Sequence, residues 1–358
     1  MSAILQLAAL ALAAGAPAQS TPDRNCTDDR GVDRCVADQQ ARTRALFGVR
    51  SIEQHRDAGD QVRRVFYVDG YGRDTIAISF VRAPGREPIA YLHFPNRQDR
   101  PANRSLETPV PELVWNDILR RSANFDRSFT PRPATQRQPG EDQEIAICLH
   151  SWVYTIEAYD PARPSGERAA LRRKTEDACE NGPGEAFAWD LQAAALPLFP
   201  FCAALDPDQH RNPASQLAAC SLLSGDRLAA ASVMNRLDSF RRARRPEDGH
   251  ILSGIFDFRA RIDWQGSVSV SSGAHPENLW LERLAADGAP AFFYESIEGL
   301  SADRVRVRGS LHRSVDGSEG TEATRSLAPV EMIWTFTGVR EFQVESVTVG
   351  AWVVQRPG

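Results

Sequence analysis

The most suggestive chemistry in the sequence is a cysteine two residues before a histidine, in the segment Cys-Leu-His-Ser-Trp-Val-Tyr that runs from Cys148 to Tyr154. In a β-strand alternate side chains share one face, so this segment places Cys148, His150, Trp152 and Tyr154 together. A cysteine beside a histidine could act as nucleophile and general base, provided that its sulfur is a thiolate. A cysteine in a disulfide has no thiolate. If the chain is exported, we therefore expect a disulfide beside a hydrogen-bonded core histidine instead of a catalytic pair.

The cysteines themselves indicate export. Their number is even, and all of them follow the predicted signal peptide, at Cys26, Cys35, Cys148, Cys179, Cys202 and Cys220. In an oxidising compartment such cysteines form disulfides. Spacing alone does not select one connectivity. The polar loop between Cys26 and Cys35 favours a local bridge, and the other four are expected to bridge the middle of the chain. No C-x2-C pair occurs, which argues against a zinc site.

Residues 1–18 are predicted to be a secretory signal peptide. The run from Ile4 to Ala14 is apolar except for Gln6, and Ala16-Pro17-Ala18 supplies the small residues that precede a cleavage site. The run is too short to span a hydrocarbon core of about 30 Å. The alternative is an apolar N-terminal helix that is buried in the fold. No later stretch is apolar enough for a membrane span, so we expect an exported protein, periplasmic or extracellular, whose mature form has no transmembrane anchor.

Two other polar clusters carry weaker chemical signals. Asp206-Pro-Asp208-Gln-His210 offers two carboxylates and an imidazole within one loop, which are groups that divalent cations use. The loop lacks the glycine and distal glutamate of an EF-hand, and its residues also form turns, so no metal is expected. The basic run Arg241-Arg-Ala-Arg-Arg245 follows a predicted helix, where positive charge complements the helix dipole.

Composition excludes several classes of protein. The 358 residues are 42% hydrophobic and 25% charged with a net charge of -5, values typical of a globular chain. A slightly acidic protein lacks the basic surface that binds phosphates, so no nucleic-acid partner is expected. The sequence contains no nucleophile elbow, zinc-protease helix, phosphate-binding loop or dinucleotide-binding turn, and no cofactor is expected. A catalytic triad built from distant residues would leave no such local motif.

The patterns predict an α+β protein with an N-terminal lobe at 19–165 and a helical, cysteine-rich connecting segment at 166–225. The lobe should contain an antiparallel sheet, because short alternating strands are separated by glycine and proline turns. Its expected elements are a helix at 37–57, strands at 65–68, 75–81 and 89–94, a helix capped by Thr108-Pro109, and a strand at 145–159. The connecting segment begins with a charged loop to about Glu176 and continues as helices at 184–196 and 213–224.

The C-terminal domain is expected at 226–358. Helical spacing predicts a long helix at 226–243 and a short one at 275–286. Alternation predicts strands at 256–264, 292–297, 305–311, 330–336 and 342–354. In the last strand Phe342 and Val344 share one parity whereas Val347 and Val349 share the other. A parity switch within one strand predicts a β-bulge near Glu345-Ser346, which lets a sheet curl.

This order of elements resembles the cone-shaped nuclear transport factor 2-like fold, which polyketide-cyclase-like and ketosteroid-isomerase-like proteins share. The resemblance covers the last third of the chain and depends on a long helix, the strand that ends Ile262-Asp-Trp264, the brief helix with Pro276-Glu-Asn-Leu-Trp280, and the antiparallel strands that follow. No catalytic dyad of the family can be carried over, because no motif here matches one. The rest of the chain shows no such resemblance.

The resemblance implies a pocket between the curled sheet and the long helix. In such a pocket Asp263 or Glu295 could act as a general base if burial raised its pKa. The alternative is that the aromatic residues fill a solid core and the acids face water. The candidate lining residues are Trp264, Trp280, Tyr294, Trp334 and Phe336.

Three functions fit these observations. The first is an exported, non-catalytic binding or envelope-associated protein whose partner is a small apolar ligand or another envelope protein. The second is a cofactor-free isomerase, cyclase or hydrolase that acts on a small apolar substrate in the C-terminal pocket. The third is a subunit of a larger assembly, which only the Pro- and Arg-rich segment 129–143 suggests.

Overall fold

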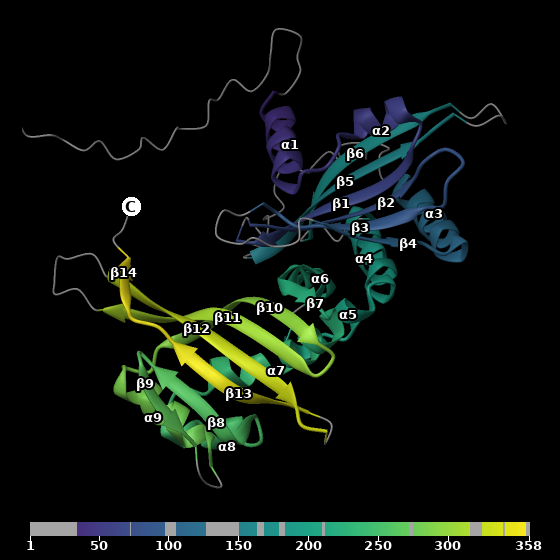
Figure 1. Ribbon diagram of the computed structural model, residues 1–358. Coiled ribbons are helices and arrows are strands. Elements are labelled where there is room, and N and C mark those ends of the chain that lie inside the picture. Colours follow the sequence, from purple (N-terminus) through teal and green to yellow (C-terminus); the bar gives the residue numbers. More distant parts are fainter. Residues whose placement is uncertain are drawn as a thin grey trace, which may run out of the picture. The chain divides into compact units, whose positions relative to one another are not determined.

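A computed structural model describes residues 34–71, 73–96, 105–126, 150–162, 168–178, 183–209, 212–271, 275–315, 324–338 and 341–355 (Figure 1). The chain forms two compact units, 1–43 and 44–358. Helix α1 (Arg34–Phe47) begins in the first unit, and every other described element belongs to the second. The domain boundaries at 165/166 and 225/226 stay a prediction.

An antiparallel sheet of six strands forms the N-terminal part of the second unit, in the order β4-β3-β2-β1-β5-β6. The predicted meander of three strands is confirmed, and Ile76, Ile78 and Phe80 lie buried on one face. The strands are β1 (Gln61–Gly70), β2 (Asp74–Arg82), β3 (Ile89–His93), β4 (Ser105–Pro109), β5 (His150–Asp160) and β6 (Ala170–Asp177).

Two strands of this sheet differ from the sequence-based expectation. Residues predicted to cap a helix form the edge strand β4, and the helix begins three residues after Pro109. Proline is tolerated there because an edge strand leaves one row of N–H groups unpaired. The predicted charged loop before Glu176 forms the other edge strand, β6, whose basic side chains pair with acids of neighbouring elements.

Helices pack on this sheet. Instead of one helix at 37–57, the chain breaks at Gly48, whose φ of 63° is in the left-handed region, and restarts as α2 (Ile52–Ala58). Ser51 and Gln54 form a capping box at its start, which satisfies otherwise unpaired N–H groups. Helix α3 (Glu112–Asp126) buries Trp115 and Ile118.

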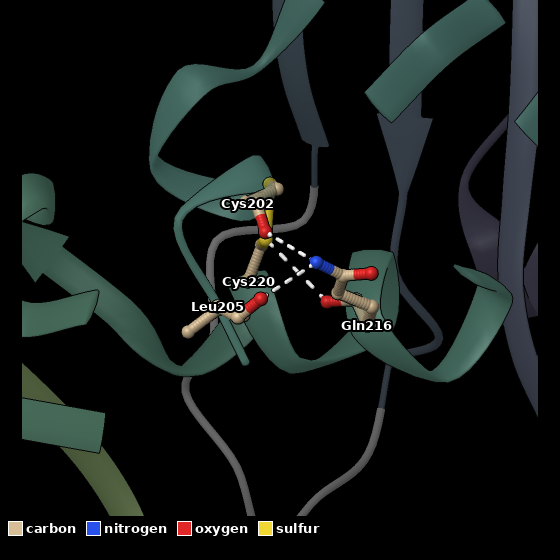
Figure 2. The surroundings of a disulfide bond; sticks show 4 residues. All are labelled: Cys202, Leu205, Gln216 and Cys220. Carbon is tan, nitrogen blue, oxygen red and sulfur yellow. Dashed lines mark hydrogen bonds between the residues drawn. A yellow bond between two sulfur atoms is a disulfide. The ribbon is translucent and has the colours of Figure 1, made fainter. Parts of the chain in front are cut away.

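The connecting segment is helical, as predicted, and one disulfide joins two of its turns. Cys202 is bonded to Cys220, and both residues are buried. Figure 2 shows Gln216 beside the bridge; its amide Nε2 donates to the carbonyl oxygens of Cys202 at 3.2 Å and Leu205 at 2.8 Å. The elements are α4 (Pro183–Ala195), η3 (Leu196–Leu198), α5 (Pro200–Ala203), η4 (Pro207–Gln209), α6 (Pro213–Ala219), η5 (Cys220–Leu222) and β7 (Leu223–Gly225).

The C-terminal part contains the long helix α7 (Arg227–Arg242), capped by the carboxylate of Asp226, and a sheet of eight strands. Its order is β7-β10-β11-β12-β13-β8-β9, with β14 paired to β12, and the β7–β10 and β8–β13 pairs are parallel. The remaining elements are η6 (Pro246–Asp248), α8 (Gly249–Leu252), β8 (Phe256–Trp264), β9 (Ser267–Val270), α9 (Glu277–Ala286), β10 (Ala291–Ser301), β11 (Arg304–Val315), β12 (Thr324–Phe336), β13 (Phe342–Val349) and β14 (Val353–Gln355).

The predicted bulge in β13 is confirmed. Trp334 pairs with Val344 and Ile333 pairs with Ser346, so Glu345 is the extra residue. Val344 and Val347 are both buried although their parities differ. The extra residue therefore lets one strand bury both halves against the same core.

The backbones of β7 and β10 approach closely at two glycines. Gly225 has a φ of 64°, and a Cβ on it would lie 2.1 Å from the carbonyl oxygen of Gly299. A Cβ on Gly299 would lie 2.0 Å from the carbonyl oxygen of Asp226. Only glycine fits at either position, directly before α7 begins.

Among the described residues, no helix is long and apolar enough to cross a membrane. The predicted signal peptide at 1–18 and the segment 129–143 lie outside the described residues.

Candidate functional site

Aromatic rings fill the space between α7, α9 and the inner face of the C-terminal sheet. Phe240 of α7 is buried at the centre of this group. Its ring centroid lies 5.4 to 6.5 Å from those of Phe256, Trp280, Phe292 and Trp334. Tilted and edge-to-face contacts at these distances are favourable. The interior implied by the resemblance is therefore packed with side chains around Phe240.

The five predicted lining residues divide between the core and the surface. Trp264, Trp280 and Trp334 are buried, whereas Tyr294 is half-buried and Phe336 is exposed beside Phe342. Within the described part of the chain, the indole N–H groups of Trp280 and Trp334 have no hydrogen-bond partner. The role of the five as ligand contacts stays a prediction.

The two predicted acids lie on the opposite face of the sheet from the aromatic core. Asp263 alternates with the buried Ile262 and Trp264, and its carboxylate accepts the N–H of Gly266 at 3.0 Å in the β8–β9 turn. Glu295 is exposed on β10 at a register shift between Tyr294 and Ser296. Their roles as general bases stay a prediction.

Glu295 belongs to a polar cluster that the sequence analysis missed. Ser310 Oγ donates to Glu295 Oε1 at 2.9 Å and lies 2.8 Å from His312 Nε2. Burial lowers the pKa of His312, which favours the neutral ring. Because the serine proton goes to the carboxylate, the imidazole donates to the serine instead of activating it. In an activated serine nucleophile the serine donates its proton to the imidazole, so the hydrogen bonds of this cluster run in the opposite direction. Pairing of β10 with β11 brings these residues together, so no local sequence motif indicates the cluster.

A groove of about 390 Å³ lies between β8 and β13, on the face that carries Asp263. The two strands run parallel in Figure 1, and their register jumps from Val344 opposite Phe256 to Ser346 opposite Arg261. Between these two pairs, residues 257–260 of β8 have no register partner on β13. Charged and hydroxyl side chains dominate the lining, which consists of Arg259, Arg261, Asp263, Glu345, Ser346, Val347 and Thr348.

The N-terminal sheet buries a chain of charged residues on one face, beneath α2. Arg64 Nη1 donates to Glu157 at 3.2 Å, and Arg64 Nη2 donates to His55 Nε2 at 2.8 Å. His55 Nδ1 then donates to Asp60 at 2.8 Å, because an ionised carboxylate can only accept. Burial lowers the pKa of His55, so this ring is neutral. Both ring nitrogens are engaged by protein groups, so this chain of contacts positions α2 and leaves neither nitrogen for a ligand.

Two further titratable groups of this sheet have lowered pKa values. Burial alone would raise the pKa of Asp160, but Arg63, Gln61 and Arg172 outweigh burial and lower it. Burial lowers the pKa of His93 to about 3, and the positive charge of Arg64 adds to this effect. The His93 ring stacks on Tyr91 with centroids 5.6 Å apart. Both groups are structural in these contacts.

The described part of the segment 148–154 belongs to β5 of the same sheet. Tyr154 is buried, and its ring packs edge-on against Tyr67 at 5.6 Å, while Trp152 is half-buried against the core. Cys148 and the side chain of His150 lie outside the described residues, as do Cys26, Cys179 and the side chain of Cys35. The expectation of a disulfide in the middle of the chain is confirmed by the Cys202–Cys220 bridge, a pairing that the spacing did not select.

The two weaker polar clusters are local structure. Asp206 accepts the N–H of Asp208 at 3.0 Å and the amide of Gln209 at 3.1 Å, which makes it a turn former; His210 lies outside the described residues. The basic run is confirmed as a helix end, since α7 stops at Arg242. Asp248 accepts the N–H groups of Arg244 and Arg245, and these bonds lower its pKa.

Comparison with known proteins finds solved structures that are similar to about a third of the chain. No protein-family profile and no curated protein matches the chain. A ketosteroid isomerase-like protein from Erwinia carotovora atroseptica SCRI1043 is 14% identical over 36% of this chain and 93% of its own, with a TM-score of 0.26. A conserved protein from Planctomyces limnophilus DSM 3776 is 14% identical over 35% of this chain and 95% of its own, with a TM-score of 0.27. LinA is 16% identical over 37% of this chain and 89% of its own, with a TM-score of 0.27.

The matches cover about a third of the chain, the extent over which the sequence predicts a nuclear transport factor 2-like fold. At these TM-scores they carry no argument about function.

Proposed function

We propose that this chain is an exported binding protein of the cell envelope, which binds its ligand on the outer face of the C-terminal sheet and not inside it. The observation that carries the proposal is the packing around Phe240. Four aromatic rings surround it at contact distance, whereas Asp263 and Glu295 lie on the opposite face. The groove beside Asp263 has room for a ligand, whereas side chains fill the interior.

Export is supported by the disulfide and by the leader-like first residues. Cys202 and Cys220 form a bridge in the folded chain, and such bonds persist in oxidising compartments. The apolar run from Ile4 to Ala14 precedes all six cysteines. An envelope location explains both features at once.

Fractionation of bacteria that express the full chain tests export. We expect the mature protein outside the cytoplasm, with an intact mass that begins at Gln19 and no thiol that reacts with iodoacetamide before reduction. The matched control is Leu10→Arg, which interrupts the apolar run without changing the mature chain and should keep the precursor inside. A wild-type precursor that stays in the cytoplasm with free thiols would contradict the proposal.

A cofactor-free enzyme is the second candidate, and one observation favours it. Two buried indole N–H groups, on Trp280 and Trp334, lack partners within the described residues, and a polar atom of a bound substrate could accept them. This candidate requires the core to open. Turnover of a small apolar ketone that Asp263→Asn or Glu295→Gln abolishes would establish it and overturn the binding proposal.

A further inference from the structure

We infer that the groove between β8 and β13 binds the carboxylate of a small organic acid, through Arg259 and Arg261. The inference deepens the proposed function and rests on it, because it assigns the ligand class to the outer face of the same sheet.

The groove lies where the number of residues between two register pairs differs between β8 and β13. Between the pairs Phe256–Val344 and Arg261–Ser346, β8 advances five residues while β13 advances two. The excess backbone of β8 cannot stay in register and must leave the plane of the pairing. Arg259 lies on this displaced stretch, and Arg261 lies directly after it, where pairing with Ser346 resumes; both side chains are exposed. The sheet therefore holds two guanidinium groups along one wall of the groove.

The acidic and the basic residues of the groove differ in how their charges are satisfied. Of the acids, Glu345 on β13 accepts from Thr335 Oγ1 at 2.6 Å and pairs with Arg304 at 3.3 Å. Asp263 accepts the N–H of Gly266.

Of the bases, the Arg261 guanidinium forms no hydrogen bond or ion pair with any residue that the structure describes, and that of Arg259 lies over the Phe258 ring at 5.1 Å. Both acids thus accept hydrogen bonds from the protein, whereas the guanidinium groups donate none within the described residues. The groove therefore offers hydrogen-bond donors with positive charge.

A carboxylate matches these donors better than other anions. A guanidinium donates two parallel hydrogen bonds to a carboxylate, and the hydroxyls of Ser346 and Thr348 can complete its coordination. The nearby carboxylates of Asp263 and Glu345 repel a multiply charged anion such as a phosphate ester more strongly than a single charge.

The size and surroundings of the groove limit the rest of the ligand. A volume of about 390 Å³ lies near the lower end for small-molecule sites. Val268 and Val270 of β9 pair with Asp263 and Arg261, share their face, and are 48% and 60% exposed. They offer apolar contact beside the charged groups. The ligand class is thus a monocarboxylate with a short apolar body, either a free acid or the C-terminal residue of a peptide.

Titration calorimetry with hexanoate, hexanamide and a tripeptide Ala-Ala-Val with a free or an amidated C-terminus tests the inference on the mature protein. We expect hexanoate to bind and hexanamide not to bind. Arg261→Gln should weaken hexanoate binding at least tenfold, which corresponds to about 1.4 kcal/mol. The matched control, Arg241→Gln, removes the same charge from the end of α7 and should leave binding unchanged. A tripeptide that binds more tightly than hexanoate, only when its carboxylate is free, would identify the peptide source.

The outcomes separate this inference from the proposed function. Equal binding of hexanoate and hexanamide, equal effects of Arg261→Gln and Arg241→Gln, or no binding of any carboxylate probe would overturn the carboxylate site. None of these results affects export or the packed interior. Failure of export, or turnover that depends on Asp263 or Glu295, would instead overturn the proposed function.

Discussion

The two sheets of this chain handle charge in opposite ways. The N-terminal sheet buries Arg64 and Glu157, each at most 2% exposed, under a short helix. The C-terminal sheet packs aromatic side chains around Phe240 and carries ion pairs on its outer face, where Arg306 pairs with Glu298 at 3.2 Å and Arg308 with Glu331 at 3.0 Å.

This difference predicts which kind of change destabilises each sheet. A buried ion pair costs desolvation energy that its own attraction and hydrogen bonds must offset, so the loss of one partner leaves an uncompensated charge. An aromatic core has no such charge and responds to lost volume instead. We therefore expect the first sheet to be sensitive to pH and the second to side-chain size.

The largest effect is expected for Phe240→Ala. Removing a ring that contacts four others leaves a cavity, and the free energy of unfolding should fall by close to 5 kcal/mol, about the upper limit for such changes. Urea denaturation followed by tryptophan fluorescence measures it. Leu228→Ala is the control on the same helix; Leu228 is 57% exposed, so its loss should cost less than about 0.5 kcal/mol. Equal effects would show that the ring cluster is not the core.

Glu157→Ala should be nearly as damaging. It strips the buried Arg64 of its carboxylate partner, at a cost of about 3–5 kcal/mol. Because Arg44 and Arg173 also contact Glu157 nearer to water, part of the freed charge can be hydrated.

A double variant sharpens the comparison with the aromatic core. Arg64→Met combined with Glu157→Met removes both charges and should recover most of the lost stability. If the double variant is less stable than Glu157→Ala, the ionic contacts contribute more than their desolvation costs.

Acid should destabilise the N-terminal sheet through His93. The unfolded chain takes up a proton near the ordinary histidine pKa of 6.5, whereas the folded chain does so only near 3. The unfolded state thus binds more protons between these values, so this contribution is complete above pH 6.5 and is lost as pH falls toward 3. At pH 5 the loss is about 2 kcal/mol.

Denaturation of His93→Phe across the same pH range checks the assignment. The variant keeps a ring to stack on Tyr91 but cannot titrate, so its stability should vary less between pH 7 and pH 5. An unchanged pH profile would assign the acid sensitivity to carboxylates such as Asp160, whose pKa is also lowered.

The smallest effect is expected on the outer face of the C-terminal sheet. Arg308→Ala removes an ion pair in which both side chains are about half exposed, and such pairs contribute less than about 1 kcal/mol. The measurement is a thermal melt at low and at high salt, with Arg241→Ala as control. A loss as large as that of Glu157→Ala would remove the contrast between the two sheets.

Local patterns in the sequence predicted the parts of the fold that depend on neighbouring residues. Alternation at Ile76, Ile78 and Phe80 identified the buried face of β2, and the parity switch after Val344 located the bulge at Glu345. Strand β6 was not predicted, because its many charged residues are typical of a loop. Its pairing partners belong to the separate strand β5.

The candidate sites were harder to predict for the same reason. Arg64 and Glu157 are 93 residues apart in sequence, and only strand pairing brings them together. The face of Glu295 could not be read from alternation, because β10 shifts register at that residue. The groove arises from a mismatch between β8 and β13, which neither strand encodes alone.

The close approach of β7 and β10 at Gly225 and Gly299 limits which substitutions this fold can accept during evolution. A Cβ at Gly225 would meet the carbonyl oxygen of Gly299, and a Cβ at Gly299 would meet that of Asp226, so neither residue can change before the two strands move apart. Descendants of this chain should inherit the two glycines as a pair, even where the adjacent Ser224 and Leu300 drift. The glycine pair should therefore help to identify distant homologues whose overall sequence identity is low.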